Sequence, residues 1–279
     1  MGKLFGLLGH PVGHSLSPIM HNDQFAHLGL DCHYTAFDVL PEQLENAVKG
    51  IRALGIAGFN VTIPHKVQVM EYLDEIDEEA RQIGAVNTVV NNNGTLIGYN
   101  TDGKGFAVSL EKLAGENFLK KKILLIGAGG AARGIYVTLA RMGAKNIDIA
   151  NRTVSKAIEL IETNQFPLHS KAFAIDEAEE MLAEYEIVIN TTSVGMSPHI
   201  DHKPLSLKNM KAGTILSDII YNPFETNWLK EGKRLGAITQ NGIGMFVRQG
   251  ALAFELWTNI KPDYDRMEQI VIQQLRGGK

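Results

Sequence analysis

A glycine-rich turn is the segment of this sequence whose residue types and spacing point most directly to chemistry. Residues 122–134 have the pattern of a buried strand, a turn spaced Gly127-x-Gly129-x-x-Ala132, and the start of a helix. Such a turn lets backbone amides and a helix N-terminus face the pyrophosphate of a dinucleotide. Because any tight strand–helix turn favours glycine, the prediction of a dinucleotide site rests on the whole unit.

The end of the following strand indicates which dinucleotide is bound. NAD-binding folds of this kind carry an acid about 20 residues after the turn, for the ribose 2′-hydroxyl. Here the strand ends Ala150-Asn151-Arg152-Thr153, Lys156 follows, and Asp148 falls within the strand. A guanidinium and an ammonium suit a 2′-phosphate through charge-assisted hydrogen bonds. We therefore expect NADP(H) rather than NAD; the alternative is that Arg152 and Lys156 belong to a solvated helix start.

Two serines close to the N-terminus are candidates for ligand binding. In Ser15-Leu16-Ser17-Pro18, the proline favours an extended Ser17. If Ser15 and Leu16 are extended too, both hydroxyls point the same way, as donors for a carboxylate or a hydroxyl. The alternative is that Ser17 is the N-cap of a helix that opens at Pro18.

A lysine follows the strand at residues 59–63. Asn60 and Thr62 share one edge of that strand and point toward Lys66, which we expect to begin the next helix. A lysine held against the positive end of a helix dipole and partly desolvated is suited to proton transfer near neutral pH. The alternative is an ordinary solvent-exposed lysine.

Asp102 and Gln249 are two further polar candidates. Asp102 precedes Gly103, where it is either the N-cap of a helix or a carboxylate at the mouth between two domains. In the second case it would hold a substrate hydroxyl and pair with Lys66, although the sequence does not place the two side by side. Gln249 shares a helical stripe with Met245, Leu252 and Leu256, so we expect its amide to be buried and to need a hydroxylated partner.

The elements that must position these residues alternate between strand-like and helix-like patterns, which predicts an α/β protein with parallel sheets. Asn93-Gly94 predicts a hairpin between residues 85–91 and 95–98. A second series of strands and helices begins at Lys122, and a helix at 103–113 crosses between the two series. The chain closes with two helices, at 245–257 and 264–276. The expected strands are 3–8, 33–37, 59–63, 123–126, 147–150, 168–173, 187–190, 215–218 and 237–239.

Composition limits the class of protein. The 279 residues suggest about two domains, and 27 basic against 31 acidic residues give a net charge of −4. That balance argues against nucleic acid or an anionic membrane as partner. We expect no membrane span and no secretory signal, since no stretch approaches about 20 apolar residues. With Cys32 as its one cysteine, the chain is expected to be soluble and cytoplasmic, and we expect no metal site.

The combination of motifs resembles the NADP-dependent shikimate dehydrogenase family, nearly from end to end. The segments that carry the resemblance are Gly9–Pro18, Gly58–Lys66, Gly84–Thr88, Gly98–Gly103, Gly127–Arg133, Asn151–Thr153, Asn190–Met196, Asp218–Pro223, Asn241–Met245 and Gln249.

The resemblance implies reversible reduction of 3-dehydroshikimate to shikimate by NADPH, in the chorismate pathway to aromatic amino acids. Lys66 and Asp102 would be the catalytic pair, with Lys66 favoured as proton donor and the division of the role left open. The implied substrate-binding residues are Ser15, Ser17, Asn60, Thr62, Lys66, Asn87, Asp102, Tyr221 and Gln249. The implied cofactor-binding residues are Glu78, Gly127, Ala128, Gly129, Gly130, Ala131, Asn151, Arg152, Thr153, Lys156, Ile219 and Gly242.

The family also implies the domain organisation. An N-terminal α/β substrate-binding domain, residues 1–103 with 241–279, would be discontinuous because the last two helices return to it. Residues 104–240 would form a Rossmann-type, doubly wound NADP-binding domain, with a cleft between the two. The alternatives are a quinate/shikimate dehydrogenase with relaxed substrate or cofactor choice, and a non-catalytic NADP-binding sensor. The expected partner is a small molecule, and the chain is expected to be a monomer or a homodimer.

Overall fold

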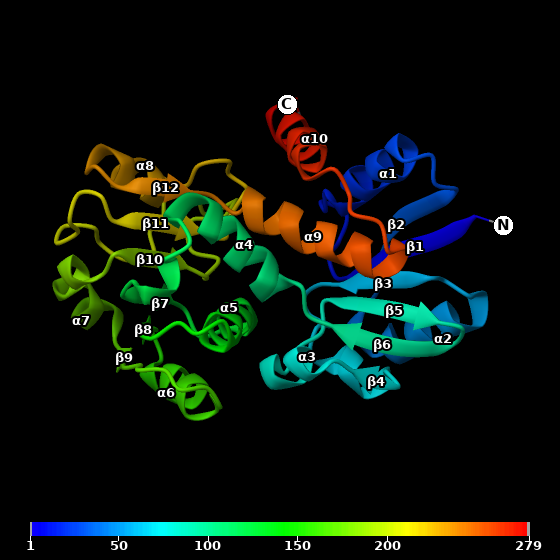
Figure 1. Cartoon of the computed structure of the whole chain (residues 1–279), viewed down its shortest axis with the longest axis horizontal. Helices are drawn as coiled ribbons and strands as arrows, with labels where there is room; N and C mark the ends of the chain where they lie inside the picture. The colour runs from blue at the N-terminus through cyan, green and yellow to red at the C-terminus, as the bar shows by residue number, and fades with distance from the viewer. Residues whose placement is uncertain (1, 278–279) are drawn as a thin grey trace. The chain divides into compact units, whose positions relative to one another are not determined.

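Two separate six-stranded sheets organise the chain, one in each of two units (Figure 1). The first unit comprises Met1–Gly105 and Val247–Lys279, and the second comprises Phe106–Phe246. The computed structural model describes residues 2–277. Within those residues, no helix combines the length and apolar character that crossing a membrane requires.

The sheet of the first unit is mixed. Its strands lie in the order β2-β1-β3-β5-β6-β4, with β1 parallel to β2 and β3 but β5 antiparallel to β3 and β6. The expectation of parallel sheets is therefore wrong for this unit, because the β5–β6 hairpin reverses the chain. That hairpin is confirmed, with Asn93 and Gly94 at φ of 52° and 96° in its turn. The strands are β1 (Lys3–Gly9), β2 (Cys32–Asp38), β3 (Gly58–Val61), β4 (Glu75–Ile76), β5 (Thr88–Asn92) and β6 (Thr95–Tyr99).

Helices cover both faces of this sheet. On one side α2 packs through Leu44, Val48 and Ile51 against Leu8 and Phe59. The helices that belong to the first unit are α1 (Ser17–His27), α2 (Leu44–Leu54), α3 (Glu78–Ile83) and α10 (Tyr264–Gly277), with α9 (Ile243–Thr258) from Val247 onward. α4 (Asp102–Ala114) begins in the first unit and continues in the second.

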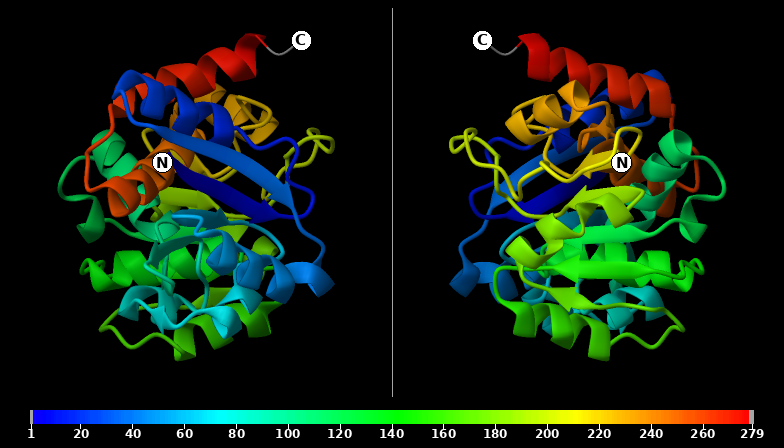
Figure 2. Two further views of the ribbon diagram at one scale, coloured as in Figure 1. Left: turned by 90° about the vertical axis from the view of Figure 1, so that its right-hand side faces the viewer. Right: turned by 90° about the vertical axis from the view of Figure 1, so that its left-hand side faces the viewer.

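The other face of the sheet packs against α1 and the C-terminal part of α9. Trp257 donates a hydrogen bond from Nε1 to the carbonyl of Val89 at 3.0 Å. A Cβ on Gly58 would lie 2.4 Å from that same nitrogen, so only glycine lets the indole approach the strand. α10 lies along α1 (Figure 2), where Arg266 makes a bidentate pair with Asp23 at 2.6 and 2.8 Å. The C-terminal helices thus complete the unit that the N-terminus begins.

The second unit contains an all-parallel sheet in the order β12-β11-β10-β7-β8-β9. The order reverses between β7 and β10, which is the arrangement of a doubly wound nucleotide-binding fold. Its strands are β7 (Ile123–Ile126), β8 (Ile147–Ala150), β9 (Ala172–Phe173), β10 (Ile187–Asn190), β11 (Ile215–Asp218) and β12 (Ile238–Gln240). Its helices are α5 (Gly130–Arg141), α6 (Val154–Glu162), α7 (Ile175–Glu180) and α8 (Asn227–Arg234).

A buried histidine lies in the aromatic core of the first unit. His21 is fully buried on α1 and stacks on Tyr34 with ring centroids 4.6 Å apart. Within residues 2–277 neither of its ring nitrogens has a hydrogen-bond partner. Burial lowers the pKa of His21 from 6.5 to about 3, because the charged ring cannot be solvated there. The folded protein therefore holds His21 uncharged.

This burial makes stability depend on pH. Below pH 6.5 the unfolded chain binds a proton at His21, whereas the folded chain does not. The free energy of unfolding therefore falls as pH drops toward 3. His21 lowers the free energy of unfolding by up to about 1.4 kcal/mol for each pH unit in this range. His21→Phe should flatten the pH dependence of urea-unfolding free energies between pH 6.5 and 4.5. His27→Gln, at an exposed position of the same helix, controls for loss of a histidine. Equal slopes for His21→Phe and the wild type would refute this account.

Candidate active site

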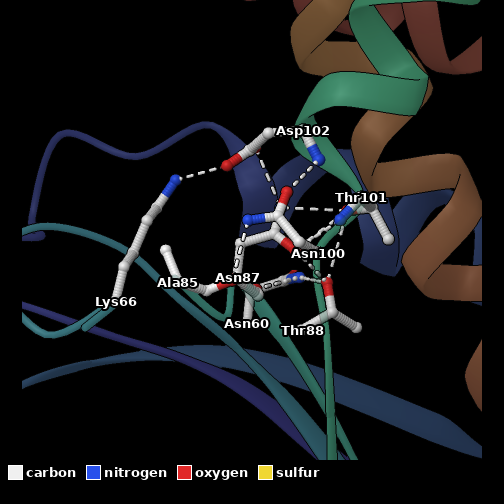
Figure 3. Close-up of polar contacts among 8 residues, drawn as sticks. All are labelled: Asn60, Lys66, Ala85, Asn87, Thr88, Asn100, Thr101 and Asp102. Carbon is white, nitrogen blue, oxygen red and sulfur yellow. Dashed lines mark hydrogen bonds and ion pairs between the residues drawn. The ribbon is translucent and has the colours of Figure 1, made fainter. Parts of the chain in front are cut away.

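Lys66 and Asp102 form an ion pair in the first unit, with Nζ 2.7 Å from Oδ2 (Figure 3). Their side chains are 29% and 13% exposed, so water screens the pair only in part. Lys66 lies in a turn between β3 and a short 3₁₀ helix at Gln68–Tyr72. The expectation that Lys66 begins a helix is wrong, because its carbonyl accepts from the amide of Val86 at 2.8 Å instead of entering a helical ladder.

Asp102 is held on its other side by Asn87. Asp102 begins α4, and its backbone amide donates to Oδ1 of Asn100 at 3.0 Å. Its carboxylate Oδ1 accepts from Nδ2 of Asn87 at 2.9 Å while Oδ2 binds Lys66. Both oxygens therefore face polar side chains, as an ionised carboxylate requires. The structure thus brings Lys66, Asn87 and Asp102 into one cluster.

Asn60 belongs to the same cluster and is 6% exposed. Its Oδ1 accepts from the hydroxyl of Tyr34 at 2.8 Å. Its Nδ2 donates to Oγ1 of Thr88 at 3.0 Å and to the carbonyl of Asn87 at 3.2 Å. Since both amide hydrogens are used inside the protein, only the carbonyl oxygen retains capacity for a further hydroxyl.

The two N-terminal serines are arranged differently from the sequence expectation. Leu16 has φ −88° and ψ −1°, which is helical rather than extended, and Ser17 is the first residue of α1 rather than its N-cap. Pro18 is tolerated because the first turn of a helix leaves its amides unpaired. Oγ of Ser15 accepts from the backbone amide of Ser17 at 3.2 Å. The two side chains therefore lie at one helix start.

Thr62 and Gln249 are the other predicted substrate residues of the first unit. Thr62 follows β3, where its amide donates to Leu8 at 2.8 Å and its side chain is half-buried. Gln249 lies where α9 approaches α4, since a Cβ on Gly105 would be 2.6 Å from its backbone nitrogen. The expectation that Gln249 shares a buried apolar stripe is wrong, because Gln249, Met245, Leu252 and Leu256 are all half-buried. The buried residues of this part of α9 are Val247, Gly250, Ala251, Ala253, Phe254 and Trp257.

The glycine-rich turn of the second unit lies at the switch point of its sheet, between the carboxyl ends of β7 and β10. Gly127 has φ +111°, and a Cβ there would lie 2.6 Å from Oγ1 of Thr191. At Gly129 and Gly130, by contrast, a Cβ would meet no heavy atom of the described residues within 4 Å. The first turn of α5 consists of small residues and one base, Gly130-Ala131-Ala132-Arg133, and Ala128 and Ala131 are half-buried. The turn therefore fits a pyrophosphate, which needs a close approach to backbone amides.

The tip of β8 fits a 2′-phosphate. Asp148 is turned away from the tip, because its oxygens accept from the amide of Lys171 at 2.8 Å and the hydroxyl of Tyr185 at 2.9 Å. Arg152, Thr153 and Lys156 are exposed beyond the strand, and Nδ2 of Asn151 donates to the carbonyl of Thr153 at 2.8 Å. Residues 151–156 carry two positive charges and no acid, so this donor set suits an anion.

Three further predicted residues lie in the second unit. A Cβ on Gly242 would be 2.0 Å from the carbonyl oxygen of Ile219, so these two residues lie together. Tyr221 packs on Phe246 with ring centroids 5.0 Å apart, and both residues belong to the second unit.

Glu78, predicted on the cofactor side, is an exposed residue of the first unit at the start of α3. Its carboxylate accepts from Nε2 of Gln82 at 3.1 Å. Glu78 thus belongs to the first unit and the glycine-rich turn to the second, and the cofactor role of Glu78 stays a prediction.

Asp218 is a buried acid that the sequence analysis left without a role. It ends β11 and accepts hydrogen bonds from Asn190, Thr226 and the amide of Ile220, all at 2.9–3.0 Å. Burial outweighs these donors and raises the pKa of Asp218 from 3.8 to about 6. A single carboxylate at the carboxyl end of an apolar strand was the signal that could have identified it.

Three models of protein families match the chain. They describe the shikimate dehydrogenase substrate-binding domain at residues 7–89, shikimate/quinate 5-dehydrogenase at 109–219, and the shikimate 5′-dehydrogenase C-terminal domain at 242–272.

Whole proteins match as well. A shikimate dehydrogenase (NADP(+)) of Geobacillus sp. (strain WCH70) is 62% identical, over 99% of this chain and 100% of the relative. A crystal structure of shikimate dehydrogenase in complex with NADP+ is 45% identical with a TM-score of 0.91, covering 98% of this chain and 96% of that one. A shikimate 5-dehydrogenase of Thermus thermophilus in complex with NADP(H) and shikimate is 36% identical with a TM-score of 0.88, covering 97% and 99%.

The exposed guanidinium beyond β8 yields a test of dinucleotide choice. Arg152→Ala should weaken binding of a dinucleotide with a 2′-phosphate by about 10- to 100-fold, the range for losing a charge-assisted hydrogen bond. Binding of the same dinucleotide without that phosphate should change little. Fluorescence titration of the two reduced dinucleotides measures both. Lys145→Ala removes an exposed charge near the opposite end of the same strand and is the control. Equal losses for both dinucleotides would exclude a role at the 2′-phosphate.

Proposed function

The chain belongs to the shikimate dehydrogenase family, and from this premise we propose that it catalyses the reversible NADPH-dependent reduction of 3-dehydroshikimate to shikimate. This reaction serves the chorismate pathway to aromatic amino acids. The observation that carries the proposal is the Lys66–Asp102 pair, with Nζ and Oδ2 2.7 Å apart and Asn87 bonded to the same carboxylate. The identity of 62% to an NADP+-dependent relative over 99% of the chain supports it.

The two units divide the task. The first unit, which we equate with the substrate-binding domain, supplies Lys66, Asp102 and the surrounding hydroxyl and amide groups. The second unit, which we equate with the NADP-binding domain, supplies the glycine-rich turn and the cations beyond β8. The pyrophosphate would be held by Gly127, Ala128, Gly129, Gly130 and Ala131, the 2′-phosphate by Asn151, Arg152, Thr153 and Lys156, and the nicotinamide would lie near Ile219 and Gly242.

Reduction of a ketone to an alcohol adds a hydride to the carbonyl carbon and a proton to its oxygen. NADPH, when bound, supplies the hydride. Lys66 is the group that donates the proton, since an ammonium carries a transferable proton and its carboxylate partner holds it in place. Asp102 holds a substrate hydroxyl and compensates the charge of Lys66. In the reverse direction the neutral amine of Lys66 accepts the proton from the alcohol.

The remaining polar residues orient the substrate. Ser15, Ser17 and Thr62 are assigned to the carboxylate, with Tyr221 contributing from the second unit. Asn60, Asn87 and Gln249 are assigned to the hydroxyls, and Glu78 to the cofactor side. The single Cys32 is consistent with a cytoplasmic location, which we also propose. The oligomeric state, monomer or homodimer, stays a prediction.

A comparison of two substrates and two cofactors tests the proposed activity. We expect the purified protein to form NADPH from NADP+ with shikimate, and to do so with a higher kcat/KM than for quinate or for NAD+. The preference for NADP+ follows from Arg152 and Lys156 beyond β8 and from the internal hydrogen bonds that occupy Asp148, and the preference for shikimate follows from the family to which the chain belongs. Absorbance at the wavelength of reduced nicotinamide measures all four combinations.

Each outcome of that assay discriminates between hypotheses. A preference for quinate with NAD+ would replace the proposal by a quinate dehydrogenase. Binding of NADP+ with no turnover of either alcohol would favour a non-catalytic sensor instead.

The role of Lys66 has its own test. Lys66→Ala should lower kcat by about 10²- to 10⁴-fold, the contribution of a general acid, while KM for shikimate changes by only a few-fold. The reason is that proton donation stabilises the transition state more than the bound substrate. Lys49→Ala, an exposed lysine of α2, is the matched control. An unchanged kcat with a raised KM would show that Lys66 only binds.

A further inference from the structure

We propose that Thr88 is a positioning residue for the Lys66–Asp102 pair, acting through Asn87. Thr88 is fully buried at the start of β5, and its Oγ1 lies 2.9 Å from Oδ1 of Asn87. Asn87 in turn donates to Asp102, so the Thr88 hydroxyl lies two hydrogen bonds from the ion pair (Figure 3). The activity readout below rests on the proposed function.

The orientation of the Asn87 amide follows from two neighbouring groups, one of which can only donate and the other only accept a hydrogen bond. At one end of the amide lies the backbone N–H of Thr101, an obligatory donor, 2.8 Å away. At the other end lies the carboxylate of Asp102, an acceptor when ionised, 2.9 Å away. Oδ1 must therefore face Thr101 and Nδ2 must face Asp102. In the flipped orientation two acceptor oxygens would face each other inside the protein.

The direction of the Thr88 hydroxyl follows from the partners around it. Nδ2 of Asn60 lies 3.2 Å from the carbonyl of Asn87, an obligatory acceptor, so this end of Asn60 carries the hydrogens. Its second hydrogen is donated to Oγ1 of Thr88 at 3.0 Å. Thr88 thus accepts from Asn60, and the nearest acceptor for its own proton is Oδ1 of Asn87 at 2.9 Å, with Oγ1 of Thr101 farther away at 3.3 Å. The hydroxyl reinforces the orientation that presents an N–H, and not an oxygen, to Asp102.

Tyr34 anchors the far end of this chain of hydrogen bonds. Its hydroxyl donates to Oδ1 of Asn60 at 2.8 Å. The side chain of Asn22 binds both the amide and the carbonyl of Tyr34 at 2.8 Å, and His21 stacks on its ring. Every donor from Tyr34 onward points toward Asp102. Because two of the members are amides, which do not relay protons readily, the network orients groups and does not conduct protons.

The sheet register makes this arrangement specific to Thr88. Thr88 pairs with Asn60 across β3 and β5 and with Tyr99 across β5 and β6. It is therefore the residue of the central strand that lies between the strand before Lys66 and the strand before Asp102. A hydroxyl at this position can bond both neighbouring amides, whereas an isosteric methyl group leaves Nδ2 of Asn60 short of an acceptor.

A pair of substitutions separates hydrogen bonding from packing. Thr88→Val keeps the volume and removes the hydroxyl, so kcat with shikimate should fall about tenfold, the scale for losing a buried hydrogen-bond partner. KM for NADP+ should stay within about twofold, because the turn at Gly127 is untouched. Thr88→Ser, which keeps the hydroxyl, should restore kcat to within about threefold of the wild type. Thr214→Val, a buried threonine of the second unit, is the matched control and should keep wild-type kcat.

The outcomes separate this inference from the proposed function. If the wild type does not oxidise shikimate with NADP+, the proposed function fails. If the wild type is active and Thr88→Val matches it, or Thr88→Ser loses as much as Thr88→Val, the positioning role is overturned.

Side-chain amide exchange provides a readout independent of turnover. In ¹H–¹⁵N spectra of the wild type, the Asn87 and Asn60 side-chain amides should be protected from exchange, and Thr88→Val should reduce that protection while thermal unfolding stays cooperative. Unchanged protection would also overturn the role. If Thr88→Val does not fold, Tyr34→Phe removes the terminal donor, with Tyr136→Phe as control. We expect a loss of kcat of a few-fold for Tyr34→Phe alone, and equal kcat values for the two variants would count against the network.

Discussion

An ion pair that is largely withdrawn from water is the interaction on which the first unit depends. Removing a carboxylate and an ammonium from solvent is costly, and the pair is tolerated only when further hydrogen bonds satisfy both groups. Here Asp102 receives one bond from Lys66 and another from Asn87. The three residues come from different segments: the turn after β3, the residue before β5 and the start of α4. Strand pairing in the mixed sheet brings these three chain positions together at one end of its strands.

The antiparallel part of that sheet matters for this reason. β5 is antiparallel to both its neighbours, so its first residue lies beside the last residues of β3 and β6. A register shift of one residue would turn Thr88 to the opposite face, so that its hydroxyl no longer faces Asn60. The tight hairpin at Asn93-Gly94, with both residues at positive φ, fixes the register between β5 and β6. Turn chemistry about five residues from the site thereby contributes to the placement of the ion pair.

The sequence predicted well those features that depend on local periodicity and turn residues. The strands at 123–126, 147–150, 187–190 and 215–218 match the structure residue for residue, because each is a short apolar run between turn signals. Prediction from the sequence failed where tertiary contacts decide the local conformation. The amide of Val86 takes the carbonyl of Lys66 and keeps it out of a helix. Ser17 enters α1 instead of capping it, and Gln249 lies beside the buried face of α9 rather than on it.

Residue types identified Lys66 and Asp102 as candidates and the family resemblance added Asn87, but the proximity of the three follows from strand pairing over long sequence separations. Thr88 and Tyr34 escaped notice because a buried threonine or tyrosine looks like ordinary core in one dimension. Each matters because of the side-chain amide that its hydroxyl faces, and that neighbour is known only once the pairing of the strands is known.

The net charge of −4 does not show where the acidic side chains of the second unit lie relative to its basic ones. Both carboxylates in its strands accept hydrogen bonds from neutral groups inside the protein. Asp148 accepts from the backbone amide of Lys171 and the hydroxyl of Tyr185, and Asp218 is buried among Asn190, Thr226 and the amide of Ile220, where burial raises its pKa to about 6. Arg152 is exposed at the same sheet edge. An anionic cofactor responds to the field within about a Debye length, close to 8 Å at physiological salt, and not to the sum over the chain. The local balance at the edge of the sheet is positive although the protein as a whole is acidic, and this reconciles the composition with a multiply charged dinucleotide.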